Sequence, residues 1–221
     1  MITDHTTLVI FTFFWALFAP FMINTAVLWL PVVGDIRPAP MYLAGQRAMI
    51  FLGIVTIAIT GGVRAFLMSA PSLVVCMEII GLTFALTLAL LDLQDRWLPG
   101  YLTVPMLLLG LLSAQISEIT SASIYGAMAF WFSITVTMVI HSIIAKRNFM
   151  SGGDMTMAAA CGAWIGIDKF AVFLGLVGMT HLAFCLLSYK FGADQKGGAN
   201  PEGLPLGPAL ALTMLVLTIF H

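Results

Sequence analysis

Two aspartates are the residues of this sequence whose surroundings point most clearly to chemistry. Asp92 directly follows the apolar run LTLALL, and Asp154 stands at the start of a later apolar segment, in MSGGDMTMAAACGAWIG. Acidic side chains in or beside membrane helices are costly to bury and are often functional. Two neighbouring carboxyl groups do not both ionise easily, so one keeps its proton while the other can activate a water molecule. The two aspartates are therefore candidates for general acid–base catalysis.

The helix ends on which these aspartates are expected to lie suggest a division of roles. Asp154 would sit at a helix N-terminus, where the positive end of the helix dipole favours the charged form. Asp92 would sit at a helix C-terminus, where the dipole disfavours that form. We therefore expect Asp154 to act as the base and Asp92 to hold the proton. A structural role stays open, because an Asp at a helix end is commonly an interfacial residue or an N-cap.

Composition indicates that a membrane bundle positions these side chains. Of the 221 residues, 61% are apolar and 9% are charged, whereas soluble domains carry roughly 25% charged residues. The net charge of -1 offers no basic surface for nucleic acid. The N-terminus lacks the Lys or Arg that opens a signal peptide, so we expect the first apolar segment to be retained. We expect one all-α integral membrane domain over residues 1–221, with short loops.

Eight apolar segments are candidates for membrane-spanning helices, each of which needs about 20 apolar residues. The sixth is short, and the alternative that it enters the bilayer and returns stays open. The predicted spans are Leu8–Leu30, Ala48–Met68, Ser72–Leu91, Tyr101–Ile116, Ile124–Ala145, Met155–Ile167, Phe170–Tyr189 and Leu204–Phe220.

The distribution of basic residues predicts the orientation, because Lys and Arg concentrate in cytoplasmic loops. With eight crossings and the N-terminus outside, seven basic residues fall in inner loops and two in outer loops; without the sixth crossing the split is six to three. The inner set is Arg37, Arg47, Arg96, Lys146, Arg147, Lys190 and Lys196, and the outer set is Arg64 and Lys169. Eight crossings place Asp92 and Asp154 together at the inner face.

The remaining polar residues give weaker evidence of a function than the two aspartates. Glu78 lacks an evident partner in the sequence, and the charged residues Asp95, Arg96, Asp168 and Lys169 are expected to be solvated loop residues. No HExxH or GxSxG motif is present, so we expect neither a zinc protease nor a serine hydrolase, and no metal or cofactor. The cysteines, Cys76, Cys161 and Cys185, are expected to be small core residues. Small residues at Ala158, Gly162 and Gly166 predict a helix-packing face.

The segment around Asp92, LLDLQDRWLPGYLTVPMLLLGLL, resembles the first catalytic motif of the type IV prepilin peptidases. In that family an Asp ends a helix and Leu-Pro follows six and seven residues later, as Leu98 and Pro99 do here. The segment containing Gly152, Gly153 and Asp154 resembles the second motif, the GxGD signature of this class of aspartic membrane proteases. Two flanking segments, FMINTAVLWLP and LPLGPALAL, also resemble family stretches, with Asn24, Pro31, Pro205, Gly207 and Pro208 in place.

The sequence departs from the family pattern at several positions. Ser151 replaces the first glycine of GxGD, Gly100 an Asp, Thr156 a Lys and Trp29 an Arg. The first inner loop is only GDIRPAPMYLAGQR, whereas many family members carry there a long insertion with paired CxxC motifs. The second activity of many relatives, N-methylation of the new N-terminus, is therefore an alternative that the resemblance supports less well than peptide cleavage.

The resemblance implies a bacterial inner-membrane aspartic endopeptidase with its active site facing the cytoplasm. Asp92 and Asp154 would be catalytic, and the partners would be the lipid bilayer and a prepilin or pilin-like protein whose leader is removed. Two alternatives from other classes are a proton-coupled transporter and a non-catalytic membrane subunit of a pilus machine. A transporter would want its carboxylates near the bilayer midplane, often on inverted repeats, and no repeat is visible here.

Overall fold

The computed structural model describes residues 2–146, 151–192 and 205–220, and over these ranges the chain is a bundle of α-helices without strands, as predicted. The elements in chain order are α1 (Ile2–Val33), α2 (Gln46–Gly62), the π-helical η1 (Val63–Leu67), α3 (Ser72–Asp95), α4 (Gly100–Ile116), α5 (Thr120–Ala145), α6 (Gly152–Ile165), the 3₁₀ turn η2 (Ile167–Lys169), α7 (Phe170–Gly192) and α8 (Gly207–Ile219).

The predicted spans correspond to these helices in order. Within the described residues, five helical segments are long and apolar enough to cross a membrane, namely α1, α2 with η1, α3, α5 and α7, and α4 and α8 are shorter apolar helices. Helix α6 has only 14 residues, so the crossing of the sixth segment stays a prediction. Most of the polar loop 190–203 lies outside the described residues.

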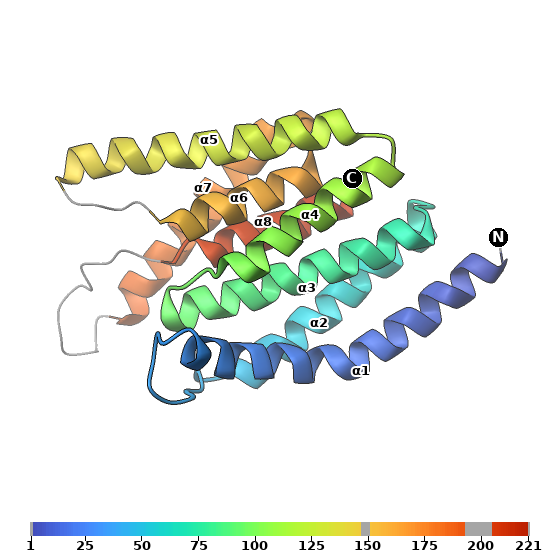
Figure 1. Ribbon diagram of the computed structural model, residues 1–221, viewed down its shortest axis with the longest axis horizontal. Coiled ribbons are helices and arrows are strands. Elements are labelled where there is room, and N and C mark those ends of the chain that lie inside the picture. Colours follow the sequence, from blue (N-terminus) through green and yellow to red (C-terminus); the bar gives the residue numbers. More distant parts are fainter. Residues whose placement is uncertain (1, 147–150, 193–204, 221) are drawn as a thin grey trace.

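Helices α3 and α6 form the centre of the bundle (Figure 1). Helix α3 packs against α1, α2, α4 and α8, and α6 packs against α4, α5 and α8. The predicted packing face on α6 is confirmed at Gly162, where a methyl group would overlap the backbone of Gly126 on α5. Ser123 on α5 reinforces this contact by donating a hydrogen bond to the carbonyl of Ala163. The bundle thus holds α6 by close backbone approach.

The segments that contain the candidate motifs lie together at one end of the bundle. The end of α1, the α1–α2 loop, the α3–α4 turn and the starts of α6 and α8 all lie on the left of Figure 1. The α3–α4 turn is compact, because Arg96 adopts a left-handed conformation (φ 51°) that ends α3, and Pro99 then begins α4. This end therefore carries both aspartates.

Glu78 lies toward the opposite end of α3 and has a partner that the sequence did not reveal. Arg64 on η1 donates to both carboxylate oxygens of Glu78, at 2.8 and 3.1 Å, and both side chains are buried. The expectation that Arg64 belongs to an outer loop is therefore wrong. Arg64 lies on the π-helical turn at the end of α2, inside the hairpin that α2 and α3 form. Its two hydrogen bonds satisfy both oxygens of the buried Glu78 carboxylate.

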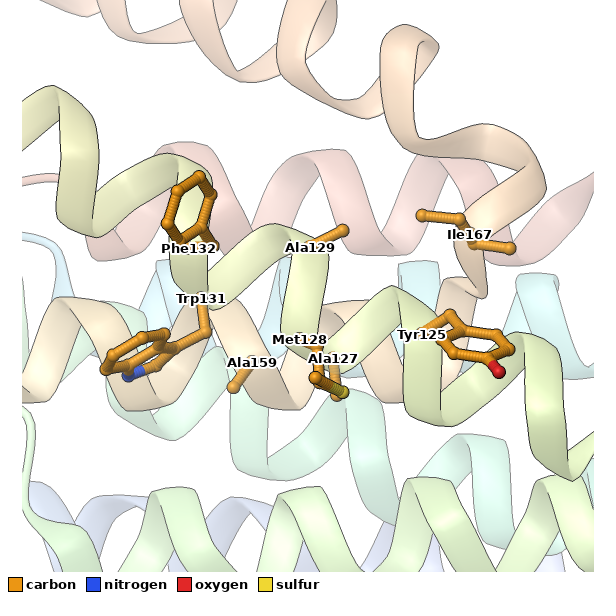
Figure 2. A pocket seen from close by; sticks show the side chains of 8 residues that line it. All are labelled: Tyr125, Ala127, Met128, Ala129, Trp131, Phe132, Ala159 and Ile167. Carbon is orange, nitrogen blue, oxygen red and sulfur yellow. The ribbon is translucent and has the colours of Figure 1, made fainter.

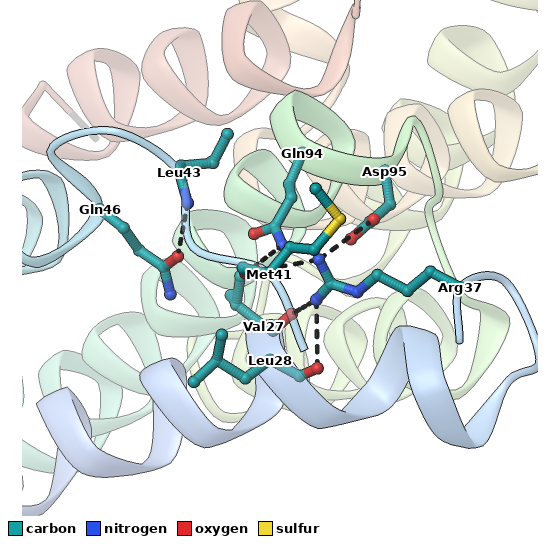
Figure 3. A network of polar contacts seen from close by, with 8 residues as sticks. All are labelled: Val27, Leu28, Arg37, Met41, Leu43, Gln46, Gln94 and Asp95. Atoms are coloured by element: carbon teal, nitrogen blue, oxygen red, sulfur yellow. Dashed lines mark hydrogen bonds and ion pairs between the residues drawn. The ribbon is translucent and has the colours of Figure 1, made fainter. Parts of the chain in front are cut away.

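The short α1–α2 loop folds back onto the bundle around Arg37 (Figure 3). Its guanidinium donates to the carbonyls of Val27 and Leu28 at 2.7 and 3.1 Å and pairs with Asp95 at 3.4 Å. Gln94 on α3 donates to the carbonyl of Met41 in the same loop at 2.6 Å. The expectation that Asp95 is a solvated loop residue is wrong, because its carboxylate lies in a buried ion pair that ties this loop to the end of α3.

Candidate active site

Asp92 is buried in the last turn of α3, with 5% of the residue exposed. Its Oδ2 accepts a hydrogen bond of 2.7 Å from the backbone N–H of Gly207, which is the first residue of α8. The sequence marked Gly207 only as part of the flanking LPLGPALAL segment. The structure gives this segment a direct contact with one of the two candidate carboxylates.

Asp154 is half-buried in the first turn of α6, before the predicted span Met155–Ile167. Ser151 occupies the N-cap position, and its hydroxyl accepts a hydrogen bond of 3.3 Å from the backbone N–H of Asp154. The alternative of an N-cap role for Asp154 therefore does not hold, since Ser151 supplies the cap. Ser151, which replaces the first glycine of GxGD, thus caps α6, and the Asp154 carboxylate is not needed as the cap.

Gly153 brings the two motifs together. A methyl group at this position would lie 2.6 Å from the Leu98 Cβ and 2.8 Å from the Leu98 carbonyl oxygen, so only a glycine allows this approach. The same addition at Gly152 would meet nothing within 4 Å. Of the two glycines before Asp154, Gly153 is therefore the one that the packing of α6 against the α3–α4 turn requires.

Thr156 forms a second bridge between these segments. Its hydroxyl lies 3.2 Å from that of the fully buried Thr103 on α4, and it also donates to the carbonyls of Gly152 and Gly153 at 3.1 and 3.0 Å. Where the family pattern has a Lys, this chain therefore has a neutral link between α4 and the first turn of α6.

The two carboxyl groups interact electrostatically. Burial, and after it the negative charge of Asp92, raise the pKa of Asp154 to about 6, and the Ser151 hydroxyl opposes this shift. A raised pKa with a second carboxylate as a cause is the pattern of a pair that shares one proton. The folded chain thus brings Asp92 and Asp154 within electrostatic reach of each other, and α3, α6 and α8 contribute to their surroundings.

The described residues show no other arrangement with comparable chemistry. No three His, Cys, Asp or Glu side chains in this part of the chain lie close enough to hold a metal ion. A wide groove of about 680 Å³ runs along α5, α6 and η2 (Figure 2), but its lining is apolar and aromatic, with Tyr125, Trp131 and Phe132 as its largest side chains. Asp168 is exposed, as expected of a solvated residue.

Comparison with known proteins bears on these motif segments. Residues 79–188 match the model of the type IV leader peptidase family, a range that contains Asp92, Leu98, Pro99 and Asp154. No solved structure matches the chain.

Several curated relatives carry the name prepilin leader peptidase/N-methyltransferase. The protein of Neisseria gonorrhoeae is 29% identical over 133 residues, which cover 59% of this chain and 43% of the relative. That of Klebsiella pneumoniae is 33% identical over 107 residues, or 47% and 46% of the two chains. That of Pectobacterium carotovorum is 27% identical over 150 residues, or 67% and 52%. The chain thus spans about half the length of the curated relatives it matches.

Proposed function

The chain belongs to the type IV leader peptidase family, and we propose that it is a membrane-embedded aspartic endopeptidase that removes the leader of a type IV prepilin or pilin-like secretion protein. The observation that carries the proposal is that Asp92 and Asp154 lie at the same end of the bundle, where the charge of Asp92 raises the pKa of Asp154. These two residues occupy the family-like motifs, and the charge of one acts on the other.

The proposed reaction needs one charged and one protonated carboxyl group. The charged group takes a proton from a water molecule as the water oxygen attacks the scissile carbonyl carbon, and the protonated group gives its proton to the carbonyl oxygen. The tetrahedral intermediate then collapses. The carboxyl group that took the water proton gives it to the leaving nitrogen as the C–N bond breaks, and the other carboxylate takes back the proton of the carbonyl oxygen, so both groups return to their starting states. The products are a leader with a new carboxylate and a protein with a new amino terminus, without a covalent enzyme intermediate.

We propose that this pair faces the cytoplasm at the inner membrane. The orientation rests on the excess of Lys and Arg in the loops at the same end as the aspartates. Both carboxyl groups then lie near the membrane boundary, where a substrate with an apolar helix in the bilayer would present the junction between its leader and that helix. Their position at one end of the bundle argues against a proton-coupled transporter, which would need carboxylates near the midplane.

Peptide cleavage is the activity that we propose for this chain, without N-methylation. The names of the relatives include both activities. Here only residues 34–45 separate α1 from α2, and Arg37 holds this segment against α1 and α3. The resemblance associates a long cysteine-rich insertion at this position with many family members, and this loop contains no cysteine.

The test is co-expression with a candidate prepilin, followed by a gel shift that reports loss of the leader. We expect Asp92→Ala and Asp154→Ala to abolish the shift while each protein still inserts and accumulates. Asp168→Ala is the matched control, because this exposed Asp is outside both motifs, and it should cleave like the wild type. Cleavage by both single variants at the wild-type rate would refute the aspartic mechanism.

A further inference from the structure

In the first turn of α8, one backbone N–H has no partner within the helix, and this N–H donates to Asp92. Pro208 has no N–H, and the N–H groups of Ala209 and Leu210 both bond to the carbonyl of Leu206 at 3.1 Å. The N–H of Gly207 remains, and it points at Asp92 Oδ2. The first turn of a helix carries partial positive charge that stabilises a nearby anion, so the carboxylate of Asp92 lies at the end of α8 that favours charge.

The contact also explains why residue 207 is a glycine. A methyl group there would lie 2.8 Å from Asp92 Oδ2 and 3.0 Å from Asp92 Cβ. The side chain of any other residue would thus force the Asp92 carboxyl group or the start of α8 to shift and would lengthen the hydrogen bond. Asp154 lies in the first turn of its own helix, α6, but no described backbone N–H donates to its carboxyl group. Ser151 and Asp92 are the groups that act on its pKa besides burial.

We propose that the Gly207 N–H makes Asp92 the charged, water-activating member of the pair, so that Asp154 carries the proton. This reverses the assignment that the sequence suggested, since that assignment considered only the helix to which each aspartate belongs. Gly207 is on this account a positioning residue. The proposal rests on the proposed peptidase function, in which Asp92 accepts the proton of the attacking water and Asp154 protonates the carbonyl oxygen.

Among the residues that the structure describes, few other charged groups act on Asp92. Arg96, one turn further along α3, acts on it through its charge, and so does Asp154 from α6. Asp95 is already paired with Arg37. Helices α4 and α8, which also pack against α3, carry no charged side chain within their bounds. The Gly207 N–H donates to Asp92 and not to Asp154, and it thus distinguishes the two carboxyl groups.

The test is the dependence of kcat/KM on pH for purified wild-type protein, Gly207→Ala and the control Gly175→Ala, with a pilin-like substrate. Residue 175 is exposed on α7, and an added methyl group there meets nothing within 4 Å. A bell-shaped profile is expected, because the mechanism needs one charged and one protonated carboxyl group. In Gly207→Ala the acidic limb should move to higher pH by about one unit, since a charge-assisted hydrogen bond is weakened. The basic limb should stay in place.

A shift of the basic limb instead would show that Asp154 is the charged member, and no shift of either limb would show that Gly207 acts only in packing. Both results would overturn the proposal and leave the peptidase function intact, whereas wild-type protein that inserts but never cleaves would refute that function. If Gly207→Ala does not fold, Arg96→Gln provides a second test of the same assignment. Arg96 is exposed, and loss of its charge should move the limb that belongs to Asp92, again the acidic one, by a few tenths of a unit.

Discussion

The two ends of α3 hold equally buried carboxyl groups in opposite electrostatic settings. Glu78 is 7% exposed and receives both hydrogen bonds of the Arg64 guanidinium. Asp92 is 5% exposed, and its close neighbours are a backbone N–H and a second carboxyl group. A carboxylate that a guanidinium neutralises is held in one charge state and contributes to structure. Asp92 is in no ion pair among the described residues, although the charge of Arg96 acts on it, so its carboxyl group can exchange a proton, which general acid–base chemistry requires.

Asp95 shows how local this difference is. It lies three residues beyond Asp92 on the same helix, yet it pairs with Arg37 and anchors the α1–α2 loop (Figure 3). The sequence carries Asp92 and Asp95 in one short stretch, DLQD, and nothing in that stretch distinguishes the two. The partner contributed by the rest of the fold decides which carboxyl group is structural and which is available.

Outside the two aspartates, the largest effect is expected at Gly153, whose contact brings the two motif segments together. Gly153→Ala should force α6 away from Leu98 and separate the two carboxyl groups, so cleavage should fall at least about 100-fold, in line with the cost of misplacing reacting groups by about 1 Å. Gly152→Ala, one residue earlier, meets nothing and should change the rate little. Initial cleavage rates of the two purified variants provide the measurement, and equal rates would contradict the role given to Gly153.

A stability effect without a comparable activity effect is expected at the other end of α3. Arg64→Gln leaves the Glu78 carboxylate buried without its cation, which should cost about 3–5 kcal/mol. Thermal unfolding in detergent should show the loss, while cleavage per folded molecule should stay near that of the wild type. The double variant Arg64→Met with Glu78→Gln should be less destabilised than either single variant. A specific loss of turnover in the double variant would show that this pair takes part in the reaction.

A smaller effect is expected at Arg37. Arg37→Gln removes the charge partner of Asp95 and weakens the hydrogen bonds to Val27 and Leu28, so the folded state should lose about 1–3 kcal/mol. Because the Arg37–Asp95 ion pair lies one helical turn from Asp92, we also expect a modest decrease in kcat. Asp95→Ala, which removes the buried charge, should keep most of the activity. An inactive Asp95→Ala beside an active Asp92→Ala would reverse the assignment of the first motif.

The sequence sufficed to predict the helices, and it marked the two aspartates on which the proposal rests. Apolar runs of sufficient length can satisfy their backbone groups in a bilayer only as helices, so hydropathy alone located them. The spacing of Leu98 and Pro99 after Asp92, and of Gly153 before Asp154, marked the candidate pair. These features are local, and each one depends on residues within one or two turns of the chain.

The contacts that give each acid its role could not be predicted, because they join distant segments. Gly207 reaches Asp92 across 115 positions, and Arg64, on a π-helical turn, meets Glu78 on the next helix across 14 positions. The phenylalanines also divide according to packing. Phe130 and Phe173 are fully buried and pack with ring centroids 4.2 Å apart and planes tilted by 42°, whereas Phe13 and Phe14 are largely exposed. Composition carries no information on such a division.

The most direct measurement of the central claim compares substrate binding and turnover in Asp92→Asn and Asp154→Asn. Each substitution keeps the shape of the side chain and fixes the position in a neutral form that cannot exchange a proton. The purified variants should retain a pilin-like substrate with a Kd within a few-fold of the wild type, while single-turnover cleavage falls by about 10²- to 10⁴-fold. Substantial cleavage by Asp92→Asn would mean that Asp154 works alone, and the account of a carboxyl pair would be contradicted.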